Sequence, residues 1–115
     1  MKRIALIYGS KENKVQHKAL EILGELLLEY TEEYPMCFGA EQYFDTEKFT
    51  CIYVGTKENN RYIKEHSSAH LCKPESYSIS VRDGVVMIEG ADDNGVLYGC
   101  VDFYNKYLVK KEFTT

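Results

Sequence analysis

The sequence predicts an α/β (α+β) fold, built from one mixed β-sheet with two long helices packed on one of its faces. Three observations lead to this prediction: apolar runs of strand length, two long segments with apolar residues at helical spacing, and a hairpin pattern around Asp83 and Gly84. In chain order the expected elements read β-α-β-β-α-β-β-α. With 115 residues the chain has the size of one domain with one modest core, so residues 1–115 are expected to form a single domain.

Strands and helices alternate in the first half of the chain. Residues 4–8 form a compact apolar run that ends at Gly9 and Ser10, which is typical of a buried strand followed by a loop. Pro35 ends the first helical pattern, and a polar, acidic stretch follows at residues 41–48. The expected elements are strands at 4–8, 36–38 and 49–54 and helices at 13–33 and 59–65.

A hairpin and a long helix are expected in the second half. Alternating residues at 77–81 and 85–88 flank the Asp-Gly pair, which is the strongest short-range signal for a hairpin. The helix should run from about residue 93 to residue 108. Asp92, Asp93 or Asn94 can cap its amino terminus.

The apolar surface of this last helix is wider than one sheet requires. Two adjoining faces form an apolar arc of roughly 160°, against the roughly 100° needed to cover a sheet. Gly95 and Gly99 leave a flat strip where a strand or a second helix can approach closely. We expect one face to contact the sheet and the other to contact a second surface, which is either the first helix or a further domain. The candidate residues for packing against a further domain are Val96, Gly99, Cys100, Phe103 and Tyr107.

Composition and charge argue against two classes of partner. The net charge is -4, from 18 acidic and 14 basic side chains, and gives no attraction for a phosphate backbone, so no nucleic-acid partner is expected. No segment approaches the roughly 20 apolar residues that span a bilayer, and the largest basic cluster is only Lys110 and Lys111. No membrane partner is expected either.

The four cysteines, Cys37, Cys51, Cys72 and Cys100, are dispersed and form no C-x-x-C pair. This spacing argues against a zinc ribbon and against a thioredoxin-like redox site. The simplest interpretation is that they are small core residues, with a disulfide as the alternative. Free thiols favour a reducing cytoplasm, although the sequence leaves the localisation open and is compatible with a secreted parent protein.

Residues 77–104, which read YSISVRDGVVMIEGADDNGVLYGCVDFY, resemble a known kind of domain. The positions that carry the resemblance are Tyr77, Ile79, Gly84, Val86, Ile88 and Gly90, then Ala91, Asp92, Gly95, Tyr98 and Gly99, and upstream Ile52, Tyr53, Val54, Gly55, Asn59 and Asn60. The pattern is similar to the amino-terminal domain that precedes the catalytic barrel in β-N-acetylhexosaminidases and α-glucuronidases.

The resemblance implies a role and a partner. In those glycoside hydrolases the catalytic carboxylates lie in the (β/α)8 barrel, so the resemblance transfers no catalytic residue to this chain. It implies a non-catalytic accessory domain of a larger carbohydrate-active enzyme, with the barrel as its partner. Two alternatives stay open: a freestanding module that binds carbohydrate or protein, and a flavodoxin-like binder of nucleotide or phosphate.

The residues that could carry catalysis or bind metal have simpler structural interpretations. Asp92 and Asp93 are adjacent at a helix start, where carboxylates complement the helix dipole, so capping is expected rather than acid-base chemistry. His66 and His70 have the spacing of two zinc ligands on a helix, yet Ser67 and Ser68 weaken the helix between them and no third ligand accompanies them. We therefore expect no metal and no cofactor.

Two further features bear on ligand binding. Gly9 and Ser10 stand where a flavodoxin-like protein would hold phosphate at a helix amino terminus, but the glycine-rich pattern of such sites is missing. Ten tyrosines could offer faces for sugar rings. Tyr43, Tyr53 and Tyr62 in particular cannot be assigned to a core or to a binding surface from their positions in the sequence.

Overall fold

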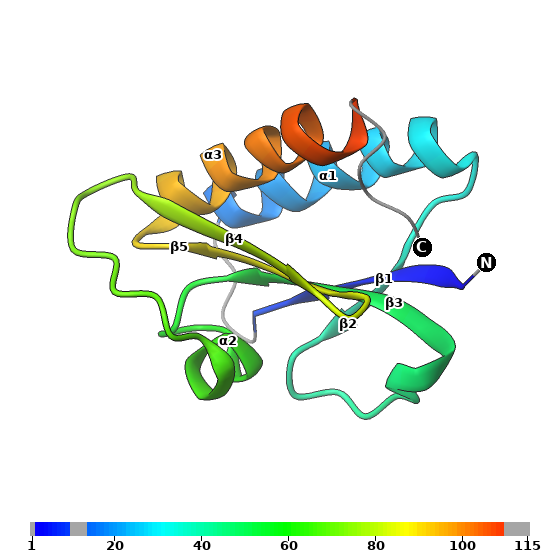
Figure 1. Ribbon diagram of the computed structural model, residues 1–115, viewed down its shortest axis with the longest axis horizontal. Helices are drawn as coiled ribbons and strands as arrows, with labels where there is room; N and C mark the ends of the chain where they lie inside the picture. Colours follow the sequence, from blue (N-terminus) through cyan, green and yellow to red (C-terminus); the bar gives the residue numbers. More distant parts are fainter. Residues whose placement is uncertain (1, 10–13, 110–115) are drawn as a thin grey trace.

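The computed structural model describes residues 2–9 and 14–109, and in them the predicted fold class and element order are confirmed (Figure 1). Five strands form one mixed sheet in the order β2-β1-β3-β5-β4. The strands are β1 (Arg3–Tyr8), β2 (Met36–Gly39), β3 (Phe49–Gly55), β4 (Tyr77–Arg82) and β5 (Val85–Gly90). The helices are α1 (Lys14–Thr31), α2 (Arg61–His66) and α3 (Asp93–Phe103), and a 3-10 turn at Thr46–Lys48 and a π-helical turn at Tyr104–Leu108 complete the set.

The central strands β1, β3 and β5 are parallel to one another and are flanked by β2 and by the antiparallel β4. Both faces of these strands are packed, which explains their nearly continuous apolar sequences. In β1, for example, Ile4 and Leu6 join a large core on one face, whereas Ala5 and Ile7 join a smaller core on the other. The sheet therefore separates two cores of unequal size.

The two long helices, α1 and α3, lie side by side on one face of the sheet, as predicted (Figure 1). Leu23 and Leu27 of α1 and Cys100 and Phe103 of α3 are fully enclosed in the large core. On the opposite face, α2 and the 40–48 segment cover the small core, with Ile63 of α2 at its centre. None of the helices described is long and apolar enough to cross a bilayer.

The hairpin between β4 and β5 turns at Asp83 and Gly84, as the Asp-Gly pair predicts. Both residues have positive φ angles, 51° and 76°, so the turn has the sense that matches the twist of the flanking strands. The turn fixes the register in which Arg82 pairs with Val85 and Ile79 pairs with Ile88. Because side chains alternate along a strand, this register decides which β4 residues face α3 and which face away.

The amino terminus of α3 is capped by Asp92, one of the three candidates. One carboxylate oxygen accepts a hydrogen bond from the Gly95 amide at 2.9 Å, and the other accepts one from the Glu75 amide at 3.0 Å. The bonds from the Glu75 and Gly95 amides hold the pKa of Asp92 below its usual value. Gly95 is required here, since a Cβ at this position would lie 2.3 Å from the Ser76 carbonyl oxygen.

The candidate residues for packing against a further domain must be corrected, because most of them are buried inside this domain. Val96, Cys100 and Phe103 are 0% exposed in the large core, and Gly99 is buried against Ile88. The fifth candidate, Tyr107, is partly buried and stacks on Phe103 with ring centroids 5.3 Å apart. The helical pattern shows two adjoining apolar faces but does not show which one meets the sheet, and four of the five candidates are buried.

The cysteines divide into two pairs, and none of the four forms a disulfide. Cys51 and Cys100 are buried, as expected for small core residues, and burial raises the pKa of Cys100 to about 12. Cys37 and Cys72 are exposed, so for this pair the core interpretation is wrong. Their position reflects a half-covered edge strand, β2, and the loop before β4.

Candidate binding surfaces

The carboxyl ends of β1 and β3 meet where an open α/β sheet would bind a ligand. In this protein a hydrogen-bonded network of side chains fills that place. The Asn59 side-chain amide donates to the Gln16 side-chain oxygen at 2.5 Å, and Gln16 in turn donates to Asp93 at 2.7 Å. The Asn59 oxygen accepts hydrogen bonds from the amide and the hydroxyl of Thr56. The network ties the end of β3 to both long helices, and most of it is buried.

This network bears on the nucleotide alternative. The side chain of Asn59 lies directly over Gly9, where a Cβ would come within 2.5 Å of it. A phosphate held at the end of β1 would need the space that Asn59 occupies. Ser10, the other residue of that hypothesis, lies outside the described residues. The geometry at Gly9 therefore favours a structural role for this edge of the sheet.

Of the acidic pair at the start of α3, Asp92 has the capping role that the sequence predicts. Asp92 holds the amides of Glu75 and Gly95, and Asp93 accepts the hydrogen bond from Gln16. Cleaving a glycosidic bond requires two carboxyl groups held across the sugar, one as acid and one as nucleophile or base. Asp92 and Asp93 are instead engaged in bonds within the fold.

The two histidines do not share a helix. The helix α2 ends at His66, Ser67 is its carboxyl-terminal cap, and His70 lies in the following loop. The four-residue spacing therefore does not place the two imidazoles on one helical face. In the part of the chain that the structure describes, no cluster of three or more His, Cys, Asp or Glu side chains has the arrangement of a metal site.

The three unassigned tyrosines have different surroundings. Tyr53 is buried, and burial raises the pKa of its hydroxyl. Tyr62 is sandwiched between Tyr53 and His66, with ring centroids 3.6 Å and 4.0 Å away. Both faces of Tyr62 are thus covered, so it cannot stack on a sugar ring. Tyr43 is 94% exposed on the 40–48 segment.

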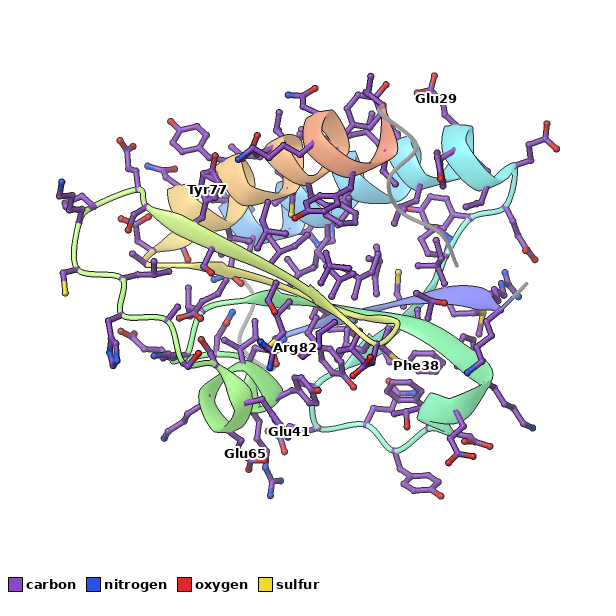
Figure 2. The ribbon with its side chains drawn as sticks, in the orientation of Figure 1. Glu29, Phe38, Glu41, Glu65, Tyr77 and Arg82 are labelled. Carbon is purple, nitrogen blue, oxygen red and sulfur yellow. The ribbon has the colours of Figure 1, made fainter. Side chains whose placement is uncertain are left out.

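A groove of about 500 Å³ opens between α2 and the β4–β5 hairpin, on the face of the sheet opposite α1 and α3. We call it the hairpin groove. The short helix α2 covers the sheet only as far as β3 and β5, so the face of β4 that points away from α1 and α3 stays open. The side chains that β4 and β5 contribute are Ser78, Ser80, Arg82, Val85, Met87 and Glu89. Figure 2 shows Arg82 on this face, while Tyr77 lies on the side of α3.

One wall of the hairpin groove is anchored by Glu89, whose carboxylate is nearly fully buried. It accepts a hydrogen bond from the Ser67 hydroxyl and lies 4.0 Å from the Lys57 ammonium. Lys57 also donates to the Ala69 carbonyl at 2.6 Å, and the Ala69 amide donates to Ser67. These bonds fix the loop that follows α2 against β5, so the wall is preorganised.

The hairpin groove was not predicted from the sequence, although a signal for it is present. Ser78, Ser80 and Arg82 alternate with apolar residues along β4, and such alternation is usually the mark of a solvated sheet face. The sequence does not reveal that a short helix runs beside this face and makes it one side of a hollow. The alternation predicts a polar face, whereas the hollow depends on tertiary packing.

The outer face of α3 is a second candidate surface. Tyr98 is 47% exposed and Val101 is 39% exposed, and the exposed amides Asn94 and Asn105 flank them. By contrast, the outer face of α1 carries the carboxylates of Glu21, Glu25 and Glu29, among others. Of the two outer helical faces, that of α3 is more apolar, and its charges in the described residues are the ion pair between Asp102 and Lys106 at its edge.

Comparison with known proteins finds a likeness of fold. No protein-family model matches the sequence, and a search of the curated proteins finds no match. Among solved structures, the fold is similar to part of a glycoside hydrolase. That protein is described as a GH138 enzyme targeting pectin rhamnogalacturonan II. The likeness has a TM-score of 0.59 at 18% identity and covers 91% of this chain but only 14% of that chain.

Proposed function

We propose that this chain is a non-catalytic accessory domain of a glycoside hydrolase and packs against the catalytic domain of that enzyme. The observation that carries the proposal is the likeness of nearly the whole chain to a small part of a GH138 enzyme, because the rest of that enzyme lies outside the likeness. The motif over residues 77–104 supports the same interpretation from the sequence. At 18% identity the likeness itself concerns the fold.

The arrangement of the acidic side chains supports a non-catalytic role. Asp92 and Asp93 hold the start of α3, and Glu89 holds the loop after α2. Asp102 accepts a hydrogen bond from the Tyr77 hydroxyl at 2.7 Å and pairs with Lys106 at 3.1 Å, which ties α3 to β4. Each of these carboxylates is engaged in a hydrogen bond that stabilises the fold.

The surface that we assign to the catalytic domain is the outer face of α3, centred on Tyr98 and Val101. The apolar and amide groups of this face can be buried without leaving an unpaired ion, because the charges at its edge, Asp102 and Lys106, already pair with each other. Burying the carboxylates on α1 would be costly. This assignment replaces the five positions chosen from the helical pattern, since four of those are buried in this domain. The occupant is the catalytic domain of the same enzyme, for which the sequence resemblance implies a (β/α)8 barrel.

The test compares the 115-residue chain with the full-length product of its gene. Val101→Glu adds a charge to the outer face of α3, and Glu25→Gln is the control on the outer face of α1. Because Val101 is exposed, its substitution should move the melting temperature of the isolated chain by no more than about 2 °C. In the full-length product, only Val101→Glu should uncouple the melting of this domain from that of the catalytic domain.

Two results would overturn the proposal. One is a gene that encodes no glycoside hydrolase domain with this chain. The other is equal behaviour of the two variants in the full-length product. The finer kinship with β-N-acetylhexosaminidases and α-glucuronidases is a separate prediction, and activity of the full-length product on aryl N-acetylhexosaminides or aryl glucuronides would support it.

A further inference from the structure

The hairpin groove has a row of polar side chains that the fold itself does not use. Ser78, Ser80 and Arg82 project from the same face of the edge strand β4. Within the described part of the chain, their side chains have no hydrogen-bond or ion-pair partner. On a flat sheet face, water would satisfy the hydrogen bonds of such a row. Here the row forms one side of the hairpin groove, where a ligand can contact it.

The opposite side and the floor of the groove are ordered before any ligand arrives. The His66 imidazole is held by stacking on Tyr62, and its Nδ1 lies 3.0 Å from the Tyr62 carbonyl oxygen. Val85 and Met87 of β5 provide an apolar floor and pack on the small core. A volume of about 500 Å³ lies within the range of roughly 300–1,000 Å³ that is usual for small-molecule sites.

The charges around the groove point to the kind of ligand. The Glu89 carboxylate is already matched by Lys57 and Ser67, so it adds little uncompensated charge. Arg82 is the unpaired cation, and a guanidinium binds a carboxylate with two parallel hydrogen bonds. Asp83 at the rim opposes it, so long-range attraction of an anion is weak. Recognition must therefore come from direct contact in the groove.

We infer that the hairpin groove binds a short oligosaccharide that carries a carboxylate, that is, a uronic-acid sugar chain. Arg82 holds the carboxylate, the Ser78 and Ser80 hydroxyls bond to sugar hydroxyls, and Met87 contacts the apolar face of a ring. A sugar ring joins a flat apolar side to a rim of hydroxyls, and the floor and sides of the groove match these two parts. The aromatic stack contributes an edge rather than a face, because both sides of Tyr62 are covered.

This binding function goes beyond the accessory role and does not depend on it. The groove and the outer face of α3 lie on opposite sides of the sheet, so one molecule can use both (Figure 1). Loss of one function would leave the other intact. The two proposals can therefore be tested separately.

The experiment titrates the 115-residue chain with three probes at one salt concentration, following backbone amide chemical shifts. The probes are tetragalacturonate, the neutral tetrasaccharide cellotetraose, and tetraglutamate, which carries carboxylates without sugar rings. Tetragalacturonate should give saturable shifts in β4, β5 and the loop after α2. The two control probes should bind at least about tenfold more weakly, since cellotetraose lacks the carboxylates and tetraglutamate lacks the sugar rings.

Variants then test the residue assignment. Arg82→Gln should weaken tetragalacturonate binding by about tenfold or more, because it removes charge-assisted hydrogen bonds. Arg61→Gln is the matched control, since Arg61 is an exposed arginine on α2 that pairs with Glu41 and Glu65 outside the groove. Equal melting temperatures of both variants and wild type would show that the fold is intact.

Three outcomes would overturn the inference. The first is the absence of shifts with tetragalacturonate at millimolar concentration. The second is binding that Arg82→Gln leaves unchanged. The third is equal binding of tetraglutamate, which would indicate an acidic protein segment as the ligand.

Discussion

Asn60 offers the sharpest test of how the fold is held together, because one fully buried side chain connects three elements. Its oxygen accepts hydrogen bonds from the amides of Tyr62 and Ile63 and so caps α2. Its amide group donates to the carbonyls of Ile7 in β1 and Val54 in β3, at 3.2 Å and 2.9 Å. We expect removal of this side chain to loosen α2 and the ends of both strands together.

The magnitude follows from these four bonds. Loss of a helix cap costs about 1 kcal/mol, and each of the two bonds to a buried carbonyl contributes about 0.5–1.5 kcal/mol. Asn60→Ala should therefore lower the free energy of unfolding by about 2–4 kcal/mol. Asn60→Asp keeps the cap acceptor but replaces the donor with an oxygen that faces two carbonyls, so its loss should be at least as large. Asn94→Ala, at an exposed asparagine on α3, should cost no more than about 0.5 kcal/mol.

The assay is urea unfolding followed by far-ultraviolet circular dichroism. For a domain of this size the slope is about 1–3 kcal/mol per molar urea, so a loss of about 3 kcal/mol lowers the midpoint by roughly 1–3 M. The slopes should stay equal if unfolding remains two-state. If both Asn60 variants unfolded at the same urea concentration as Asn94→Ala, the argument that this side chain links α2 to the strand ends would fail.

Three further predictions concern α3. Phe103→Ala should cost about 3–5 kcal/mol in urea unfolding because Phe103 is 0% exposed, whereas Val101→Ala should cost no more than about 0.5 kcal/mol. Gly95→Ala should lower the melting temperature, although alanine favours a helix by about 1 kcal/mol, because its Cβ would meet the Ser76 carbonyl oxygen at 2.3 Å. The pKa of Asp92 in the folded chain lies below its value of about 3.8 in the unfolded chain. The stabilising effect of this carboxylate is therefore present above pH 3.8 and is lost as the pH falls through the folded pKa. Asp92→Asn should weaken this acid dependence of the free energy of unfolding, measured by urea unfolding at a series of pH values.

Each of these has a clear contrary result. Equal losses for Phe103→Ala and Val101→Ala would mean that the buried face of α3 is wrongly assigned. A Gly95→Ala variant as stable as wild type would mean that α3 lies farther from the segment before β4. An unchanged acid dependence in Asp92→Asn would assign that dependence to another carboxylate.

Much of the fold follows from the sequence because its signals are local. The Asp83–Gly84 turn needs positive φ angles, and an Asp-Gly pair is one of the few that adopt them readily. The apolar runs of β1 and β3 signal strands buried on both faces, and the spacing in α1 signals a helix with one buried side. These features depend on neighbours within a few residues.

The surfaces were harder to predict because they depend on which elements meet. Both apolar faces of α3 satisfy the same helical spacing, and packing against the sheet and α1, including the approach of Gly99 to Ile88, determines which one is buried. The helix α2 covers one face of β5 but does not reach β4. The uncovered face of β4, which carries Ser80 and Arg82, therefore forms one side of the hairpin groove. Contacts between residues far apart in the chain decide both cases.

The central claim is that the outer face of α3 packs on a catalytic domain, and side-chain footprinting of two tyrosines tests it most directly. Tyr98 is 47% exposed on that face, and Tyr43 is 94% exposed on the far side of the sheet. Hydroxyl-radical labelling should modify both in the isolated chain. In the full-length gene product, labelling of Tyr98 should fall severalfold while that of Tyr43 stays the same. Equal labelling of Tyr98 in the two proteins would contradict the claim.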